Sequence, residues 1–368
     1  METQTLIRTD KLGRAKCEHC DVMLEVSEFH VFEEIQCPEC GKTTTVPGKL
    51  GDYYLMRELG RGGMGAVFLA RDAHLERKVA LKVLNAKFGR DPSFVDALLS
   101  EAKAAAALNH KNIVHIYSFG QVYEQPYFVM EYVEGIHLDE CINPGEAQNE
   151  EGWLGIMAQV TKGLILSEEV GLIHGDIKPA NILLNEQGLA KLSDFGIARF
   201  GGDQEDRILG TPLYIAPEKS RGKKFDARSD QFSLGATFWH ILTGQPPFFG
   251  KTSREVVLHR FEIPPPDPRQ HAPHLSKATA TMLMRMMAVD PEERFPDFQA
   301  VRERIQKILN RFEENRKKKA LEEKEAEKAR LAAEEALNQK KRMKKRLGMV
   351  ACGIGVLVAL GALLVFWI

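Results

Sequence analysis

Four cysteines near the start of the chain have the types and spacing of a metal site. Cys17 and Cys20 form one Cys-x-x-Cys pair, Cys37 and Cys40 form a second, and 16 residues separate the pairs. Each pair can present two thiolates to one ion, and two pairs complete the tetrahedral set that zinc prefers. The alternative, two redox-active dithiols in a loose tail, is disfavoured because no thioredoxin-type βαβ pattern surrounds them. The spacing therefore predicts a zinc site.

Residues 1–48, which carry these cysteines, resemble a zinc ribbon, with short strands expected between Val22 and Ile35. A segment this short buries too little apolar surface to fold alone, so the zinc is expected to be structural. Ribbons bind nucleic acid or protein, but acidic residues outnumber basic ones here. We therefore expect protein docking or a purely structural role, and no nucleic-acid partner.

A glycine-rich segment follows, in which Gly60, Gly62 and Gly65 have the spacing G-x-G-x-x-G. Alone, this pattern fits a dinucleotide fingerprint or a flexible turn. A dinucleotide site needs a helix to open at the third glycine, whereas residues 66–69 continue as an apolar, strand-like run. We therefore predict a hairpin whose backbone amides cover phosphates.

Two charged residues downstream of the glycines suit the same site. Lys82 lies in a strand-like run over residues 79–84, and Glu101 lies in a helix predicted over residues 94–108. A lysine on a strand and a glutamate on a helix can form the ion pair that aims the ammonium at the α and β phosphates. Singly, each is more often a surface charge, so the prediction depends on the ordered set.

Three more motifs follow in order: His-Gly-Asp-Ile-Lys-Pro-Ala-Asn at residues 174–181, Asp-Phe-Gly at 194–196 and Ala-Pro-Glu at 216–218. With these motifs the chain resembles the protein kinase family over residues 52–312. Lys178, three residues before Asn181, is similar to the serine/threonine branch, and the chain looks like the eukaryotic-like (Hanks-type) kinases of bacteria. The resemblance implies an α+β, bilobal protein kinase fold that has a β-rich N-lobe and an α-helical C-lobe. It also implies an enzyme that transfers the γ-phosphoryl group of ATP to Ser and Thr hydroxyls of protein substrates.

The resemblance assigns the chemical roles residue by residue. Asp176 would accept the proton of the substrate hydroxyl, and Lys178 would neutralise charge on the transferred phosphoryl group. Asn181 and Asp194 would supply oxygen ligands to magnesium or manganese. The other implied roles are adenine packing by Val67, Ala80 and Leu183, adenine hydrogen bonding by the backbone of Glu131 and Val133, a gatekeeper at Met130, a substrate-loop residue at Thr211, a structural ion pair of Glu218 with Arg294, and anchoring of the catalytic loop by Asp230.

One motif departs from the family pattern, because Gly175 stands where the family usually has an arginine between His174 and Asp176. That arginine pairs with a phosphorylated activation-loop residue, so its absence removes the side chain that would bind the phosphate. The stretch from Gly196 to Thr211 contains no Ser, Thr or Tyr before Thr211 itself. We therefore expect activity that does not depend on activation-loop phosphorylation. A nucleotide-binding pseudokinase scaffold that docks partners through the ribbon is the alternative, and a small-molecule phosphotransferase is a third reading.

The C-terminal part has a different composition. Residues 313–346 are rich in Ala, Glu, Lys and Arg, which predicts a solvated helical linker with too few apolar positions for a convincing coiled-coil seam. Residues 348–368 contain no charged residue and are long enough for one transmembrane helix. Six of the seven residues at 340–346 are basic, which places the rest of the chain on the cytoplasmic face of the cell membrane, with a single-pass C-terminal anchor in the lipid bilayer. Ala351, Gly355 and Ala359 recur every four residues and permit close packing of two such helices in a homodimer.

These residues need helices and strands to position them, and the composition of the chain is compatible with a folded protein. The chain has 368 residues, 44% of them hydrophobic and 27% charged, which is typical of a globular protein of two or three units. The formal net charge of -1 argues against bulk attraction to nucleic acid. Strands are predicted at residues 66–69, 79–84 and 127–132, and helices at residues 94–108, 152–170 and 229–243. The early strands and late helices indicate two lobes.

Overall fold

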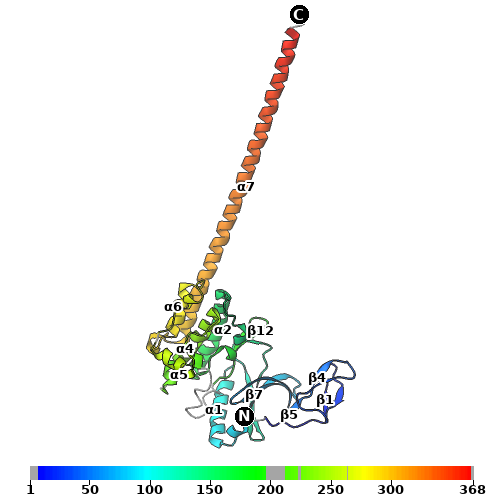
Figure 1. Cartoon of the computed structure of the whole chain (residues 1–368), viewed down its shortest axis with the longest axis vertical. Helices are drawn as coiled ribbons and strands as arrows, with labels where there is room; N and C mark the ends of the chain where they lie inside the picture. Colours follow the sequence, from blue (N-terminus) through cyan, green and yellow to red (C-terminus); the bar gives the residue numbers. More distant parts are fainter. Residues whose placement is uncertain (1–6, 196–211, 223–224, 263, 366–368) are drawn as a thin grey trace. The chain divides into compact units, whose positions relative to one another are not determined.

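The computed structural model describes residues 7–195, 212–222, 225–262 and 264–365, and the chain divides into two compact units, Met1–Ile308 and Leu309–Ile368 (Figure 1). The first unit contains both the ribbon-like segment and the kinase-like segment. The predicted linker and membrane segment belong to the second unit.

Two short antiparallel hairpins carry the cysteines. Strand β1 (Arg14–Lys16) pairs with β2 (Met23–Glu25), and β3 (Glu34–Gln36) pairs with β4 (Thr43–Thr45). Their apolar side chains form a small core of their own that contains Ala15, Leu24, Val26 and Val46 together with Cys17 and Cys37. Each strand has only three residues, and isolated hairpins this short are marginally stable, so further contacts are needed to hold them folded.

A six-stranded antiparallel sheet forms the N-lobe. The order of its strands is β5-β6-β7-β8-β10-β9, with bounds β5 Gly48–Leu50, β6 Tyr53–Gly62, β7 Gly65–Asp72, β8 Lys78–Leu84, β9 Ile116–Val122 and β10 Gln125–Glu131. Helix α1 (Pro92–Ala106) connects β8 to β9. It begins at Pro92 because the Asp91 carboxylate accepts hydrogen bonds from the amides of Ser93 and Phe94.

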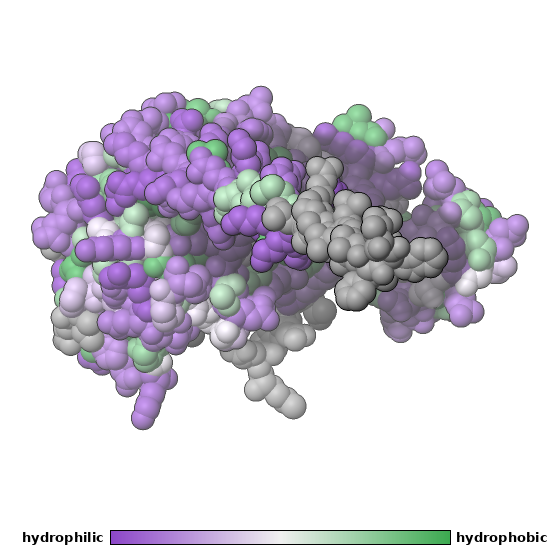
Figure 2. All heavy atoms as spheres, turned by 90° about the horizontal axis from the view of Figure 1, so that it is seen from above, coloured by the Kyte–Doolittle hydropathy of each residue, from purple (hydrophilic) through white to green (hydrophobic). Residues whose placement is uncertain are grey.

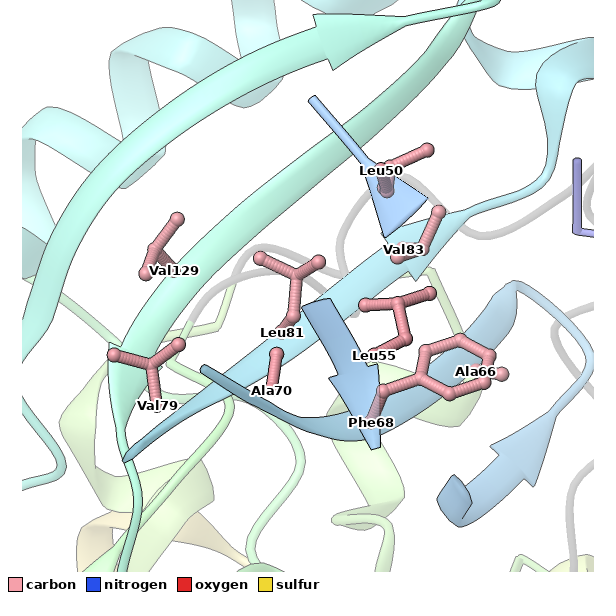
Figure 3. Close-up of a cluster of buried hydrophobic side chains, with 9 residues drawn as sticks. All are labelled: Leu50, Leu55, Ala66, Phe68, Ala70, Val79, Leu81, Val83 and Val129. Carbon is pink, nitrogen blue, oxygen red and sulfur yellow. The ribbon is translucent and has the colours of Figure 1, made fainter. Parts of the chain in front are cut away.

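The register separates the two faces of this sheet. Val67 lies opposite Lys82 and Leu69 opposite Ala80, so these side chains share one face. Phe68 lies opposite Leu81 and therefore points to the other face. There a buried cluster forms, which we call the outer-face core: Leu50, Leu55, Ala66, Phe68, Ala70, Val79, Leu81, Val83 and Val129 (Figure 3).

The C-lobe is mostly helical. Its helices are α2 (Glu150–Glu169), α3 (Pro217–Ser220), α4 (Ala227–Thr243), α5 (Ser253–Glu262) and α6 (Lys277–Met286), with a small sheet of β11 (Gly135–His137), β12 (Ile182–Asn185) and β13 (Ala190–Leu192). Helix α4 lies at the centre, because Phe232, Phe238 and Trp239 are fully buried. Hydrophilic side chains cover most of the face shown in Figure 2, with apolar residues in small groups.

Helix α7 (Phe298–Val365) continues without interruption from the end of the C-lobe. It begins with the buried Phe298, Val301 and Ile305, and from Glu314 to Lys344 every side chain is exposed. Among the residues whose side chains the structure describes, no helix is both long enough and apolar enough to cross a membrane. Most side chains from 350 onward lie outside that description, so the membrane helix at 348–368 stays a prediction.

Candidate active site

The loop with the motif at residues 174–181 lies between helix α2 and strand β12 in the sequence, and it is hydrogen bonded to helix α4. The two carboxylate oxygens of Asp230 accept hydrogen bonds from the amides of His174 and Gly175, at 2.7 and 2.8 Å. Burial raises the pKa of Asp230, while the nearby imidazole and these two amide donors act in the opposite direction. Gly175 has φ +79°, a conformation that favours glycine. Asp230 thus anchors the turn that presents Asp176.

His174 orients the same loop from inside the C-lobe. Its Nε2 lies 2.7 Å from the carbonyl oxygen of Ser193, and its Nδ1 accepts the amide hydrogen of Asp176 at 3.2 Å. These contacts require a neutral ring that carries its hydrogen on Nε2. Burial lowers the pKa of His174, which favours the neutral form. The imidazole therefore links the loop of Asp176 to the segment of Asp194.

Asp176, Lys178 and Asn181 converge at the surface of this loop. The Lys178 ammonium donates to Oδ2 of Asp176 at 2.8 Å, and Nδ2 of Asn181 donates to the same oxygen at 3.0 Å. Nδ2 of Asn181 also donates to the Asp176 carbonyl at 2.7 Å. Among the described residues, both side-chain hydrogen bonds to the Asp176 carboxylate are made to Oδ2. The Oδ1 atom of Asn181 and the Asp194 carboxylate are the hard oxygen donors that magnesium prefers.

Lys82 and Asp194 form an ion pair between the two lobes, with Nζ to Oδ1 at 2.7 Å. Burial alone would raise the pKa of Asp194, but the Lys82 ammonium outweighs it and the pKa lies below its usual range. Asp194 has φ +64°, an uncommon conformation for a residue other than glycine that marks functional turns. Glu101 is on helix α1 as predicted, but among the described residues the ion pair of Lys82 is with Asp194 rather than with Glu101.

The glycine-rich segment forms the hairpin between β6 and β7, with Gly62 opposite Gly65. A Cβ on Gly65 would lie 2.0 Å from the carbonyl oxygen of Val83, so this position requires glycine. Asn85 braces the tip, because its side-chain amide donates to the Gly63 carbonyl at 3.1 Å and its backbone amide to that of Met64 at 2.9 Å. Sequence reasoning missed Asn85, since a lone Asn after a strand carries no signal.

The residues predicted to pack against adenine lie on the N-lobe sheet and on strand β12. Val67 and Ala80 share the inner face of the N-lobe sheet, and Met130, opposite Ala80, lines a small cavity with Phe195 and Asp194. Leu183 lies on β12 opposite Lys191. Lys191 was not predicted, yet its ammonium lies 2.9 Å from the Glu131 carboxylate, and it ties the end of β10 to β13 just before Val133.

Two predicted residues of the C-lobe, Glu218 and Arg294, contact each other directly. Glu218 and Arg294 form a bidentate ion pair at 2.7 and 2.9 Å inside the C-lobe. Thr211 lies outside the described residues, as do residues 196–210.

The four cysteines form a single cluster in which their sulfur atoms all lie within 4.8 Å of one another. The Sγ atoms of Cys17 and Cys40 are 3.9 Å apart, and those of Cys20 and Cys37 are 3.7 Å apart. With zinc–sulfur bonds of about 2.3 Å, sulfurs at the corners of a tetrahedron lie about 3.8 Å apart. A hydrogen bond from the His19 amide lowers the pKa of Cys17 to about 6, whereas burial and the three other cysteine side chains raise the pKa of Cys20 to about 12, so only the distances between the sulfurs indicate an ion. The residues present therefore fit a tetrahedral ion.

This fold and this arrangement of loop, lysine and carboxylates define a protein kinase, and comparison with known families agrees. The family described as "Protein kinase domain" matches residues 53–308, and the chain belongs to this family. Its relatives include serine/threonine-protein kinase PknB of Mycobacterium leprae, 40% identical over 261 residues, and PknB of Mycolicibacterium smegmatis, 41% identical over 263 residues. Each match covers 68% of this chain but only 42% of the relative, so the chain spans less than half the length of these proteins.

A solved structure supports the fold assignment. The kinase domain of Mycobacterium tuberculosis PknI has 29% sequence identity and a TM-score of 0.57, and the match covers 70% of this chain and 96% of that domain. The bilobal fold expected from the sequence is confirmed.

Proposed function

We propose that this chain is a serine/threonine protein kinase that transfers the γ-phosphoryl group of ATP to a hydroxyl group of a protein substrate. The observation that carries the proposal is the convergence of Asp176, Lys178 and Asn181 on one loop, together with the Lys82–Asp194 ion pair. The relatives' names support the serine/threonine class.

The geometry suggests how the residues divide the reaction. Asp176 orients the substrate hydroxyl and takes its proton, while Lys178, already 2.8 Å from the Asp176 carboxylate, lies where charge develops on the transferred group. Asn181 and Asp194 would hold the divalent ions, magnesium or manganese, which neutralise the phosphates of ATP. Thr211 is proposed as the substrate-loop residue.

The nucleotide would lie between the lobes. Val67 and Ala80 above and Leu183 below would enclose adenine, and the backbone of Glu131 and Val133 would hydrogen bond to its edge. The amides of Gly60, Gly62 and Gly65 would cover the phosphates. Lys82 would then move from Asp194 toward the α and β phosphates, held from helix α1 by Glu101.

Activity is proposed to be independent of activation-loop phosphorylation. Gly175 has no guanidinium that could bind a phosphate. The loop of residues 174–181 is held by hydrogen bonds of Asp230 and His174. The pseudokinase scaffold is not favoured, because the sequence contains every residue assigned to ATP, the divalent ions and proton transfer. The Ala216 motif and Thr211 argue against a small-molecule phosphotransferase.

Two further parts of the proposal concern the ends of the chain. The cysteine cluster would hold one structural zinc ion, and the distances between its sulfurs support this assignment. Residues 348–368 would anchor the protein at the cytoplasmic face of the cell membrane, with the basic block at 340–346 against anionic lipid and a homodimer through Ala351, Gly355 and Ala359.

The function is tested by incubating the full chain in detergent with labelled ATP, magnesium and generic protein substrates, followed by phosphoamino-acid analysis. We expect label on serine or threonine, and equal activity after phosphatase pretreatment of the enzyme. Loss of all activity after that pretreatment would overturn the independence from phosphorylation. Label on tyrosine only would overturn the assigned class.

A further inference from the structure

The outer face of the N-lobe sheet is covered by the ribbon. The ring of Phe32 stacks on that of Phe68 with 5.6 Å between centroids and 15° between planes. Phe32 and Ile7 both pack against the outer-face core. A Cβ on Gly48 would lie 2.8 Å from a methyl carbon of Val31, so the ribbon also closely approaches strand β5.

A second attachment fixes the N-terminal segment that leads into the ribbon. The backbone of Arg8 exchanges two hydrogen bonds with the buried side chain of Gln125, at 2.7 and 3.1 Å. The Arg8 guanidinium lies 4.3 Å above the Tyr123 ring, and Asp10 and Lys49 exchange backbone hydrogen bonds at 2.7 and 3.0 Å. The ribbon is therefore held to the sheet at two places.

Phe32 is tied to the cysteine site within the ribbon. Strand β3 begins two residues after Phe32 and ends next to Cys37, and β4 lies between Cys40 and Val46. The Phe32 amide donates to the Val46 carbonyl at 2.8 Å. An ion at the cysteines would close one end of this hairpin while Phe32 lies at the other. Phe32 also has φ +69°, which is rare for a bulky residue and persists where the surroundings fix it.

On the other side, Phe68 is tied to the nucleotide site. It lies three residues after Gly65 on β7, and its neighbours Val67 and Leu69 point to the nucleotide face. Its partner across the strands, Leu81, precedes Lys82. A shift of the outer-face core would therefore move the glycine hairpin and the strand that carries Lys82.

We propose that Phe32 is a positioning residue for the nucleotide: it acts through Phe68 to hold the glycine hairpin, so that the state of the cysteine site sets the affinity for ATP. This inference rests on the proposed function, because it assumes that nucleotide binds on the inner face of the sheet. It adds that the ribbon contributes to nucleotide binding by the N-lobe and is not only a docking module.

The test uses the full chain with a fluorescent ATP analogue, so that binding is measured without phosphotransfer. Phe32→Ala should weaken binding by about threefold to tenfold, the range expected for loss of one stacked aromatic pair. The KM for ATP should rise by the same factor while kcat stays within about twofold. Phe32→Tyr, which keeps the ring, should bind like the wild type. The control is Met23→Ala, since Met23 is an apolar ribbon residue that is 54% exposed, and it should change nothing.

Zinc removal provides the second arm. A chelator selective for zinc over magnesium should weaken nucleotide binding by the wild type as Phe32→Ala does, and should add little in that variant. If Phe32→Ala does not fold, this arm alone decides. Unchanged affinity in a folded Phe32→Ala protein, or in the zinc-free wild type, would overturn the inference. A wild type that binds no nucleotide would instead overturn the proposed function.

Discussion

At the scale of single residues, the buried ion pair of Arg294 with Glu218 shows how a charge is stabilised inside the C-lobe. Arg294 is fully buried, and its two terminal nitrogens bind the two oxygens of Glu218. Burial alone would raise the pKa of Glu218, but Arg294 outweighs it, so the pKa lies below its usual range. Removing one member of such a pair leaves the other charge without compensation.

We therefore expect Glu218→Gln to lower the free energy of unfolding by about 3 kcal/mol near pH 7. Because the folded pKa is depressed, the stabilisation is complete above the unfolded pKa of about 4.3 and is lost as pH falls through the folded value. Denaturant titrations between about pH 7 and about pH 3 should show the wild type and the variant converging at the acid end. The matched control is Glu313→Gln, which breaks the exposed pair with Lys317 and should leave unfolding unchanged. A gap of the same size at both pH values would contradict the role of this ion pair.

Much of the candidate site could be predicted from the sequence because its residues lie in short motifs with fixed order. Asp176, Lys178 and Asn181 are within six residues of one another, so local spacing is informative. Asn85 and Lys191 could not be predicted, since each acts only through a contact made by the fold. The partner of Lys82 was also beyond the sequence, because Asp194 and Glu101 are both suitable carboxylates.

At the scale of elements, hydrophobic periodicity predicted the main strands and helices, with ends off by a few residues. The helix predicted from residue 94 begins at Pro92, because Asp91 caps it. The helix predicted over residues 152–170 spans Glu150–Glu169, and Asn149 caps it through the Gly152 amide. The docking of the ribbon on the sheet could not be predicted, since Phe32 and Phe68 are distant in sequence and only the register places Phe68 on the outer face.

The ribbon hairpins are expected to depend on a bound zinc ion. Their three-residue strands and small core should require the ion, so Cys37→Ser should lose bound zinc and expose residues 7–46 to limited proteolysis. Metal analysis of the purified full chain should give one zinc per wild-type chain and much less for the variant. Cys141→Ser is the control, because Cys141 lies outside the cluster. Full zinc content in Cys37→Ser would contradict a four-cysteine site.

At the scale of the whole molecule, the near-zero net charge conceals opposed blocks. Acidic residues dominate the ribbon segment, and six basic residues are concentrated at 340–346. Helix α7 continues past this block to Val365 without a break. We propose that helix α7 carries both the charged linker and the membrane anchor in one continuous helix.

Deleting residues 348–368 should abolish stable binding to vesicles that contain anionic lipid. The basic block remains in this variant, so residual binding should disappear at high salt, where charges at a surface are screened. Full-length protein should stay with the vesicles at the same salt concentration, as measured by sedimentation. Salt-resistant binding of the deletion variant would contradict the anchor.

The central claim, that the chain is an active kinase, is tested most directly by Asp176→Asn. The substitution keeps the size of the side chain and removes the proton acceptor, so phosphotransfer should fall by roughly a hundredfold to ten-thousandfold. Affinity for the fluorescent ATP analogue should be unchanged, because Asp176 contributes nothing to the proposed adenine and phosphate contacts. Phosphotransfer at the wild-type rate, with nucleotide binding intact in both proteins, would contradict the account.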